Sequence, residues 1–309
     1  MKRHLFLRVL KKGRTARSVI GMLALTGSVG FGVIGLSASV SSAATTRPQA
    51  PMPAADGPVH NWHNILAHNT AGWCDGAPPP CSGGSGDYGT IDIVSHTFSN
   101  SGGYAASVPG PSGQAHYARI SGGQDGGVDS ISGCSTPGGE NCSGPYTLFG
   151  THNLGTDSIF PVNGFTTSIE IYLDTSWAST YQGNLVGWDT SLNNTSGSFL
   201  QDQTFDICSV SGGFYISTAF GSGGCTSGSP QVTTSGWYTF NEDFTGVPGG
   251  DVYDTYSVVQ DSSSSVVFGP SAVDTGLAKT GVGGPDYGWF PDEDVLGLPI
   301  AQASLKTNP

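Results

Sequence analysis

Basic side chains are almost absent from this sequence after its first 43 residues. Seven of the 11 Lys and Arg residues lie in 1–43, whereas none of the 23 Asp and Glu residues does. Residues 44–309 therefore carry four basic side chains against 23 acidic ones, a net charge of −19. Such a surface repels phosphate backbones and anionic headgroups, which disfavours binding to nucleic acid or to a membrane surface. It suits neutral ligands such as glycans, or a cation such as Ca²⁺.

Short motifs that mark common catalytic centres are also missing. The sequence has no C-x-x-C, no G-x-S-x-G and no H-E-x-x-H, so redox, serine-hydrolase and zinc-protease chemistry have no marker. Three histidines, His60, His63 and His68, lie within residues 59–69. We expect that segment to be a short amphipathic helix packed on the body of the protein, with its histidines turned to water.

The N-terminus has the pattern of a cleaved secretion signal. Basic residues occupy 2–17, an apolar stretch of 15 residues follows at 22–36, and small residues at Ser41 and Ala43 suit a signal peptidase. A membrane anchor is the alternative, but a spanning helix needs about 20 apolar residues. We expect 1–43 to be removed, 44–58 to be a disordered Pro/Ala-rich spacer, and the remaining chain to be extracellular and free of the membrane.

Six cysteines lie beyond the signal sequence, and an even number in an exported chain favours disulfides over metal or catalytic thiols. Six cysteines allow 15 connectivities, and spacing alone does not choose among them. Three close pairs nonetheless bracket loops rich in Gly, Pro or Ser. They suggest the bonds Cys74–Cys81, Cys134–Cys142 and Cys208–Cys225.

Alternating polarity after about residue 90 predicts an all-β fold. The clearest segment is 164–174, in which Phe165 and Ile169 fall on one face while Glu170 and Tyr172 fall on the other. Helix formers are scarce, and 48 glycines punctuate short β-branched and aromatic runs. Tight turns are expected at 211–213 and 261–265. Further strands are expected at 91–98, 115–120, 145–150, 184–192, 204–210, 214–220, 235–244, 252–261, 265–269, 286–290 and 295–305.

Four stretches carry a family resemblance. They are GPYTLFG, the GF…SIEIYLD strand, SGWYTF before an acidic strand, and YGWF before a final apolar strand. The region from about 145 to 305 resembles the concanavalin A-like (LamG-like) jelly-roll sandwich of secreted bacterial proteins. The resemblance implies an antiparallel jelly-roll sandwich over 59–309, with an N-terminal elaboration at 59–90, and a glycan-binding or adhesive role. No diagnostic catalytic or metal-binding motif of such proteins matches.

Paired carboxylates are the first candidates for chemistry, because glycosidases place two of them across a groove. Only four Glu follow the signal sequence, and Glu170 and Glu242 lie within expected strands. Glu170 shares a face with Tyr172, whereas Glu242 shares one with Tyr238, Phe240 and Phe244. The pair is a weak catalytic candidate, and solvated strand residues are the alternative.

Aromatic side chains beside amides or carboxylates are candidates for glycan binding, because sugar rings stack on flat aromatic faces. In the loop at 175–184 the candidates are Trp177, Tyr181 and Asn184, and at a strand end they are Trp188 and Asp189. Burial in the core is the commoner fate of tryptophan. We treat Trp237 and Trp289 as core residues.

A Gly-rich acidic loop at 124–130 is the metal candidate, with Asp125 and Asp129 as oxygen ligands for Ca²⁺. A solvated turn is the alternative. The sequence thus favours an extracellular non-catalytic module that binds a glycan or polysaccharide or is surface-associated. A glycoside hydrolase with paired glutamates and a structural or adhesive envelope protein are the alternatives. We make no prediction of oligomeric state.

Overall fold

A computed structural model describes thirteen stretches of the chain, all within the compact unit that spans residues 46–309. The proposed signal peptide, the spacer and the Asp125–Asp129 loop lie outside them. No helix in these stretches is long and apolar enough to cross a membrane. The described residues are 62–65, 73–74, 90–95, 114–121, 123–124, 142–143, 146–147, 160–179, 183–195, 198–220, 225, 228–290 and 298–309.

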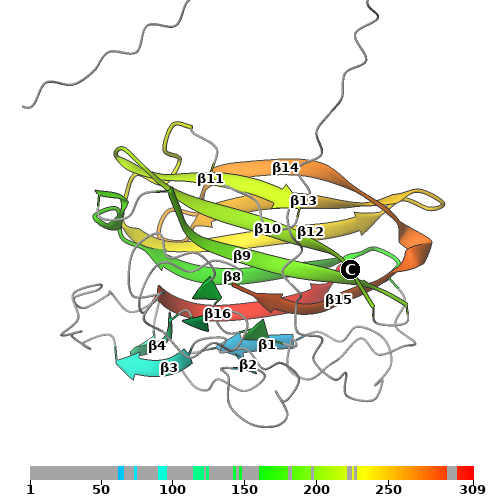
Figure 1. Ribbon diagram of the computed structural model, residues 1–309, viewed down its shortest axis with the longest axis horizontal. Coiled ribbons are helices and arrows are strands. Elements are labelled where there is room, and N and C mark those ends of the chain that lie inside the picture. The colour runs from blue at the N-terminus through cyan, green and yellow to red at the C-terminus, as the bar shows by residue number, and fades with distance from the viewer. Residues whose placement is uncertain are drawn as a thin grey trace, which may run out of the picture. The chain divides into compact units, whose positions relative to one another are not determined.

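The larger of two antiparallel sheets has eight strands (Figure 1). Their order is β14-β13-β12-β8-β16-β4-β3, and β1 pairs with β16 as well. The strands are β1 (Trp62–Ile65), β3 (Thr90–Ser95), β4 (His116–Ser121), β8 (Phe165–Leu173), β12 (Gly236–Gly246), β13 (Asp251–Gln260), β14 (Ser265–Ala278) and β16 (Leu298–Thr307).

The smaller sheet has six strands in the order β11-β10-β9-β15-β7-β2. A separate two-stranded ladder joins β5 and β6, and two single 3-10 turns, η1 (Trp177–Ser179) and η2 (Lys279–Gly281), complete the described elements. The strands are β2 (Trp73–Cys74), β5 (Gly123–Gln124), β6 (Cys142–Ser143), β7 (Tyr146–Thr147), β9 (Gly183–Asn194), β10 (Phe199–Val210), β11 (Gly213–Phe220) and β15 (Val282–Trp289).

The two sheets pack face to face through aromatic side chains. Phe205 of the smaller sheet lies 5.3 Å from Phe240 and 4.9 Å from Tyr256 of the larger one, measured between ring centroids, and both contacts are edge-to-face. This geometry is the favoured one for aromatic pairs. The protein is therefore an antiparallel β-sandwich of the jelly-roll type, and the expected fold class is confirmed.

Period-two patterning placed most strands correctly, and both expected turns are confirmed. Val210 pairs with Gly213, so Ser211 and Gly212 form the turn between β10 and β11, with Gly212 in the left-handed region at φ 90°. Gln260 pairs with Ser265 across the second turn. Gly164 is required before β8, because a Cβ at its position would lie 1.8 Å from the backbone oxygen of Phe244.

Two expectations about the fold are corrected. The helix expected over 59–69 is wrong where the structure describes it, because Trp62–Ile65 form strand β1, which pairs antiparallel with Gln302–Leu305 of β16. Residues 59–61 and 66–69 lie outside the described residues. Strand β14 also continues nine residues beyond Gly269, where the pattern predicted an end. Proline is tolerated there because β14 is an edge strand.

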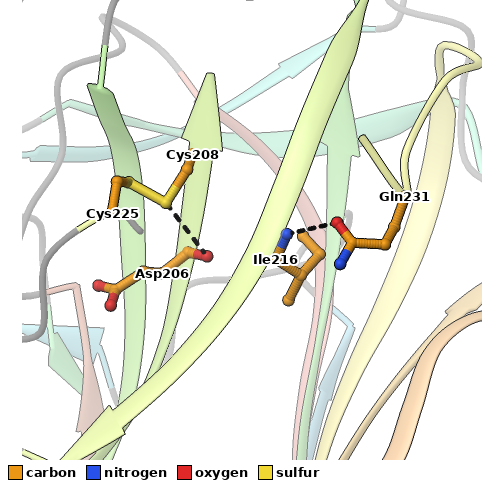
Figure 2. The surroundings of a disulfide bond; sticks show 5 residues. All are labelled: Asp206, Cys208, Ile216, Cys225 and Gln231. Carbon is orange, nitrogen blue, oxygen red and sulfur yellow. Dashed lines mark hydrogen bonds between the residues drawn. A yellow bond between two sulfur atoms is a disulfide. The ribbon is translucent and has the colours of Figure 1, made fainter. Parts of the chain in front are cut away.

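The bond Cys208–Cys225 is confirmed (Figure 2). It ties the end of β10 to the segment that follows β11, with 5.6 Å between the two Cα atoms. In the same region the Gln231 side chain accepts a hydrogen bond from the Ile216 backbone N–H at 2.9 Å, so the chain after the disulfide returns along β11 (Figure 2). The proposed bonds Cys74–Cys81 and Cys134–Cys142 involve side chains outside the described residues.

Candidate functional site

Glu170 and Glu242 lie on opposite faces of the large sheet. Glu242 pairs with Thr167 across the β12–β8 ladder, and Glu170 pairs with Thr239. Cross-strand partners share a face and successive residues alternate, so Glu242 points into the core with Phe240 and Glu170 points away from it. The predicted catalytic pair is therefore wrong, because the sheet itself separates the two carboxyl groups.

The outer face of the large sheet carries a band of hydrogen-bonding side chains that we call the polar band. Most of its members are half-buried. Several members bond one another across neighbouring strands. Thr166 donates to Asp243 at 3.0 Å, and Ser168 and Ser304 share a hydrogen bond of 2.8 Å. The polar band comprises Thr166, Ser168, Glu170, Thr239, Asn241, Asp243, Asp261, Gln302 and Ser304.

Glu170 is the most perturbed group of the polar band. Burial chiefly, then a hydrogen bond with Asp261 and the charge of Asp261, raise its pKa to about 8, although a hydrogen bond with Gln302 acts in the opposite direction. Only 7% of Glu170 is exposed. Asp261 is held in turn by the Thr239 hydroxyl, which donates at 2.7 Å. At neutral pH the Glu170 carboxyl group therefore keeps its proton.

A β-bulge brings Gln302 to Glu170. The β16–β8 register shifts between Ile300, which pairs with Ile171, and Gln302, which pairs with Glu170. Without this register shift, Gln302 would pair with the inward-facing Ile169 and would point into the core. Sequence analysis missed Gln302 and Asp261, because the contact depends on this bulge and on the turn after β13. No local signal in the sequence marks either residue.

Aromatic rings stand beside Glu170 on the same face. Trp237 pairs with Tyr172 across the β12–β8 ladder, with 5.4 Å between ring centroids, and Tyr117 of β4 lies 6.0 Å from Trp237. Each ring is less than a tenth exposed. Arg119, two residues along β4 from Tyr117, faces the same way and is 8% exposed. The polar band thus borders an aromatic cluster at the centre of the sheet.

The predicted aromatic platforms are buried. Trp177 is 5% exposed and packs edge-on against Tyr172 at 6.4 Å, while Trp188 is fully buried against Phe290 at 5.1 Å. Neither ring presents a free face, so the expectation of exposed stacking platforms is wrong for both. Large aromatics gain more from burial between the sheets than from exposure at a strand end.

The other predicted ligand-binding residues are dispersed. Asp189 lies on the outer side of the small sheet, 1% exposed, where it accepts hydrogen bonds from Thr204 at 2.8 Å and from Ser191 at 3.4 Å. Tyr181 lies outside the described residues, as does the side chain of Asn184. The structure therefore does not bring Asp189 to the face of Trp188, because neighbouring strand residues point to opposite sides.

A second group of polar side chains lies between the two sheets, and we call it the polar layer. It divides the apolar core into two clusters, one containing Phe240 and Tyr256 and the other containing Phe244 and Val252. Each of its strands contributes one polar residue at an inward-facing position, where the alternation of apolar and polar residues would place an apolar side chain. The layer comprises Thr167, Thr190, Gln203, Glu242 and Asp254, each at most 1% exposed.

Hydrogen bonds satisfy only part of the polar layer. Thr167 donates to Glu242 Oε2 at 3.0 Å and shares a 2.8 Å hydrogen bond with the Thr190 hydroxyl. Tyr256 donates to Gln203 Oε1 at 3.3 Å, a long bond. Glu242 Oε1 and both carboxyl oxygens of Asp254 have no hydrogen-bond partner. Sequence analysis did not find the layer, because its other members lie 23 to 87 residues after Thr167 and on different strands.

Burial dominates the electrostatics of the layer. It raises the pKa of Glu242 well above its ordinary value, the nearby charge of Asp254 adds to this effect, and hydrogen bonds from Thr190 and Thr167 oppose it. Burial likewise raises the pKa of Asp254, and the adjacent Tyr256 hydroxyl partly offsets this rise. Two carboxyl groups thus share an interior in which ionisation is costly.

The predicted metal ligands Asp125 and Asp129 lie outside the described residues. Within the described stretches, no three Asp, Glu, His or Cys side chains gather closely enough to hold a metal ion by themselves. Any cation bound there would need hydroxyl or amide oxygens in addition to carboxylates. The polar layer contains such hydroxyl and amide oxygens together with two carboxyl groups.

Comparisons with known proteins add little. No protein-family model matches the sequence, and no curated protein matches it. Among solved structures, an endo-β-1,4-glucuronan lyase from the fungus Trichoderma reesei aligns over 76% of this chain and 92% of its own, at 10% identity and a TM-score of 0.29. A likeness this low carries no argument about the site or its chemistry.

Proposed function

We propose that this protein is an extracellular, non-catalytic glycan-binding protein and that the polar band is its binding surface. The observation that carries the proposal is the band itself, a group of hydroxyl, amide and carboxyl side chains on the adjacent strands β12, β8 and β16 and in the turn after β13. Sugar hydroxyls both donate and accept hydrogen bonds, so they match this mixture of side chains. The secretion signal and the concanavalin A-like resemblance support an extracellular carbohydrate ligand.

Asn241 is the clearest free group in the band. It lies at the centre of β12, is half-buried, and no described side chain forms a hydrogen bond with its amide. A half-buried amide without a partner is available to a ligand at little cost. Its neighbours on both sides, Ser168 and Ser257, are also small polar residues, so a flat polysaccharide chain could lie across the three strands.

Charge selects the class of glycan. Residues 44–309 carry four basic side chains and 23 acidic ones, and the band itself contains three carboxyl groups. Carboxylates accept hydrogen bonds from sugar hydroxyls but repel uronate or sulfate groups. The ligand is therefore an uncharged polysaccharide.

The arrangement of carboxyl groups supports binding over hydrolysis. Glycosidase carboxyl groups stand about 5–10 Å apart so that the sugar and the reacting water fit between them. Glu170 and Asp261 instead hydrogen-bond directly to each other, which leaves no room between them. Glu242 lies on the far side of the sheet and cannot serve as the second group.

Affinity electrophoresis of the secreted protein through gels of neutral and acidic polysaccharides tests the proposal. We expect retardation by at least one neutral polysaccharide and none by alginate or pectin. Asn241→Ala and Ser168→Ala should each weaken binding about tenfold, the loss of one or two hydrogen bonds to the ligand. Ser217→Ala, a half-buried hydroxyl on β11 of the other sheet, is the matched control and should bind normally. Equal retardation of all four proteins would overturn the assignment of the surface.

A further inference from the structure

Two ionisable side chains of the polar layer meet inside the sandwich. Glu242 pairs with Tyr256 and Asp254 pairs with Phe244, so the two carboxyl groups are diagonal neighbours on the inner face of β12 and β13. Diagonal neighbours are within reach of a shared ligand. Both residues are at most 1% exposed, and three of their four carboxyl oxygens lack a hydrogen-bond donor. Buried polar atoms in folded proteins are nearly always satisfied, so a partner for these oxygens is missing.

No basic side chain supplies that partner within the described part of the chain. Arg119 faces outward from β4. Lys279 Nζ donates to the carbonyls of Val162 and Gly246 at 3.0 and 3.3 Å, and Lys306 is exposed. Asp189, on the opposite side of the small sheet, adds further negative potential at Glu242. No described basic side chain therefore offsets the charge of the two carboxyl groups when they ionise.

We propose that the polar layer binds a hard cation, of which Ca²⁺ is the type, between Glu242 and Asp254. Ca²⁺ takes six to eight oxygen ligands at 2.3–2.6 Å, so one ion can join carboxyl oxygens that stand about 5 Å apart. Gln203 Oε1 and the hydroxyls of Thr167 and Thr190 supply neutral oxygens in the same layer. Water would complete the coordination shell.

Protonation of the two carboxyl groups explains the layer less well. A protonated carboxyl group has a hydroxyl that needs an acceptor, and neither oxygen of Asp254 lies in a hydrogen bond of good geometry. The Tyr256 hydroxyl beside Asp254 has one proton to donate and forms a 3.3 Å hydrogen bond with Gln203, so it satisfies at most one Asp254 oxygen. A cation would satisfy both oxygens of Asp254 and Glu242 Oε1 at once and would neutralise the charge that burial penalises.

Cation binding here would join β8, β9, β10, β12 and β13, because each of these strands contributes one residue to the layer. The ion would therefore bind the folded sandwich and have no comparable site in the unfolded chain. Its binding free energy would add to the stability of the fold. This site is independent of the polar band, since the two occupy opposite faces of the same strands.

Calcium-dependent thermal unfolding of the secreted protein, after removal of metals with a chelator, tests the proposal. We expect Ca²⁺ between 0.01 and 10 mM to raise the Tm by several degrees in a saturable way, beyond what Mg²⁺ or NaCl does at equal ionic strength. Glu242→Gln and Asp254→Asn should each reduce the Ca²⁺ affinity at least tenfold, and the double variant should lose the effect. Asp243→Asn, on the same strand but the outer face, is the matched control and should retain it.

Metal content gives a second readout that needs no variant. The wild-type protein, equilibrated with 1 mM CaCl₂ and desalted, should carry one calcium per chain by elemental mass spectrometry. Calcium-independent unfolding, an unchanged calcium effect in the double variant, or a wild-type protein without bound calcium would each overturn the proposal. None of these outcomes bears on glycan binding, which the polar-band variants test separately.

Discussion

The two faces of strand β12 carry similar polar groups in different environments. On the outer face, the carboxyl group of Glu170 on the adjacent strand has Asp261 and Gln302 as partners, and Asn241 and Thr239 are half-buried. On the inner face, Glu242 lies with Asp254 between two apolar clusters, and most of their oxygens have no donor. The outer group can exchange partners with water and ligand, whereas the inner group depends entirely on what the interior supplies.

This difference separates binding from stability. Substitutions of half-buried, non-ionising residues on the outer face should alter ligand affinity with small effects on unfolding, because water replaces the lost partner. Substitutions on the inner face should alter unfolding, because the interior is close-packed and excludes water. Matched variants at neighbouring positions of one strand can therefore distinguish the two faces. The two residues share the same backbone geometry, but their side chains point to opposite faces of the sheet.

Phe240 and its neighbour Asn241 give the largest expected contrast. Phe240 is fully buried and meets Phe205 of the other sheet edge-on, so Phe240→Ala should lower the free energy of unfolding by about 3–5 kcal/mol. Asn241→Ala should lower it by less than about 0.5 kcal/mol. Urea denaturation followed by tryptophan fluorescence measures both. Similar losses in the two variants would contradict the assignment of the faces.

The ionisation of Glu170 gives the next effect. Its pKa is about 8 in the folded protein, against an ordinary value of 4.5. The folded state therefore keeps a proton that the unfolded chain releases, and the free energy of unfolding should fall as pH rises from about 4.5 to 8. Glu170→Gln cannot ionise, so it should flatten this slope and be more stable than the wild type at pH 8.5 by about 1–3 kcal/mol.

Urea denaturation at a series of pH values provides the measurement. Other carboxyl groups titrate in the same window, so the informative quantity is the difference between the variant and the wild type. Ser168→Ala, which lies on the same face of β8 and does not titrate, should run parallel to the wild type. A Glu170→Gln curve that is also parallel would show that Glu170 does not keep its proton at neutral pH.

The local pattern of apolar and polar residues was sufficient to predict most strands and turns, but not how distant strands pair. The alternation in 164–174 correctly gave β8 and the opposite directions of Ile169 and Glu170. The closeness of Cys208 and Cys225 in sequence suggested their bond, which the structure contains. The segment around Trp62 was wrongly predicted as a helix, because its apolar spacing fits a helical face. Pairing with the edge of β16 overrides that local preference.

The sites were harder to predict than the fold, because each is assembled from distant strands. Glu170 was identified from its strand, but its partners depend on the bulge in β16 and on the turn that follows β13. Glu242 was correctly placed on the face of Phe240. Its neighbour in the layer, Asp254, belongs to another strand, and only the register of β12 against β13 brings the two together. Register is a tertiary property that a single strand's pattern does not encode.

Thr167 and its neighbour Ser168 on β8 give the smallest and most selective contrast. Thr167 is fully buried and donates to Glu242 at 3.0 Å, whereas Ser168 is half-buried and bonds Ser304. Thr167→Val keeps the side-chain shape and removes the hydroxyl, so it leaves Glu242 Oε2 without its donor. We expect the free energy of unfolding to fall by about 1–2 kcal/mol. Ser168→Ala should cost less than about 0.5 kcal/mol, since Ser168 is only half-buried and bonds a neutral hydroxyl. Equal losses in urea denaturation would mean that the hydroxyl of Thr167 contributes no net stability, and that another group already satisfies Glu242.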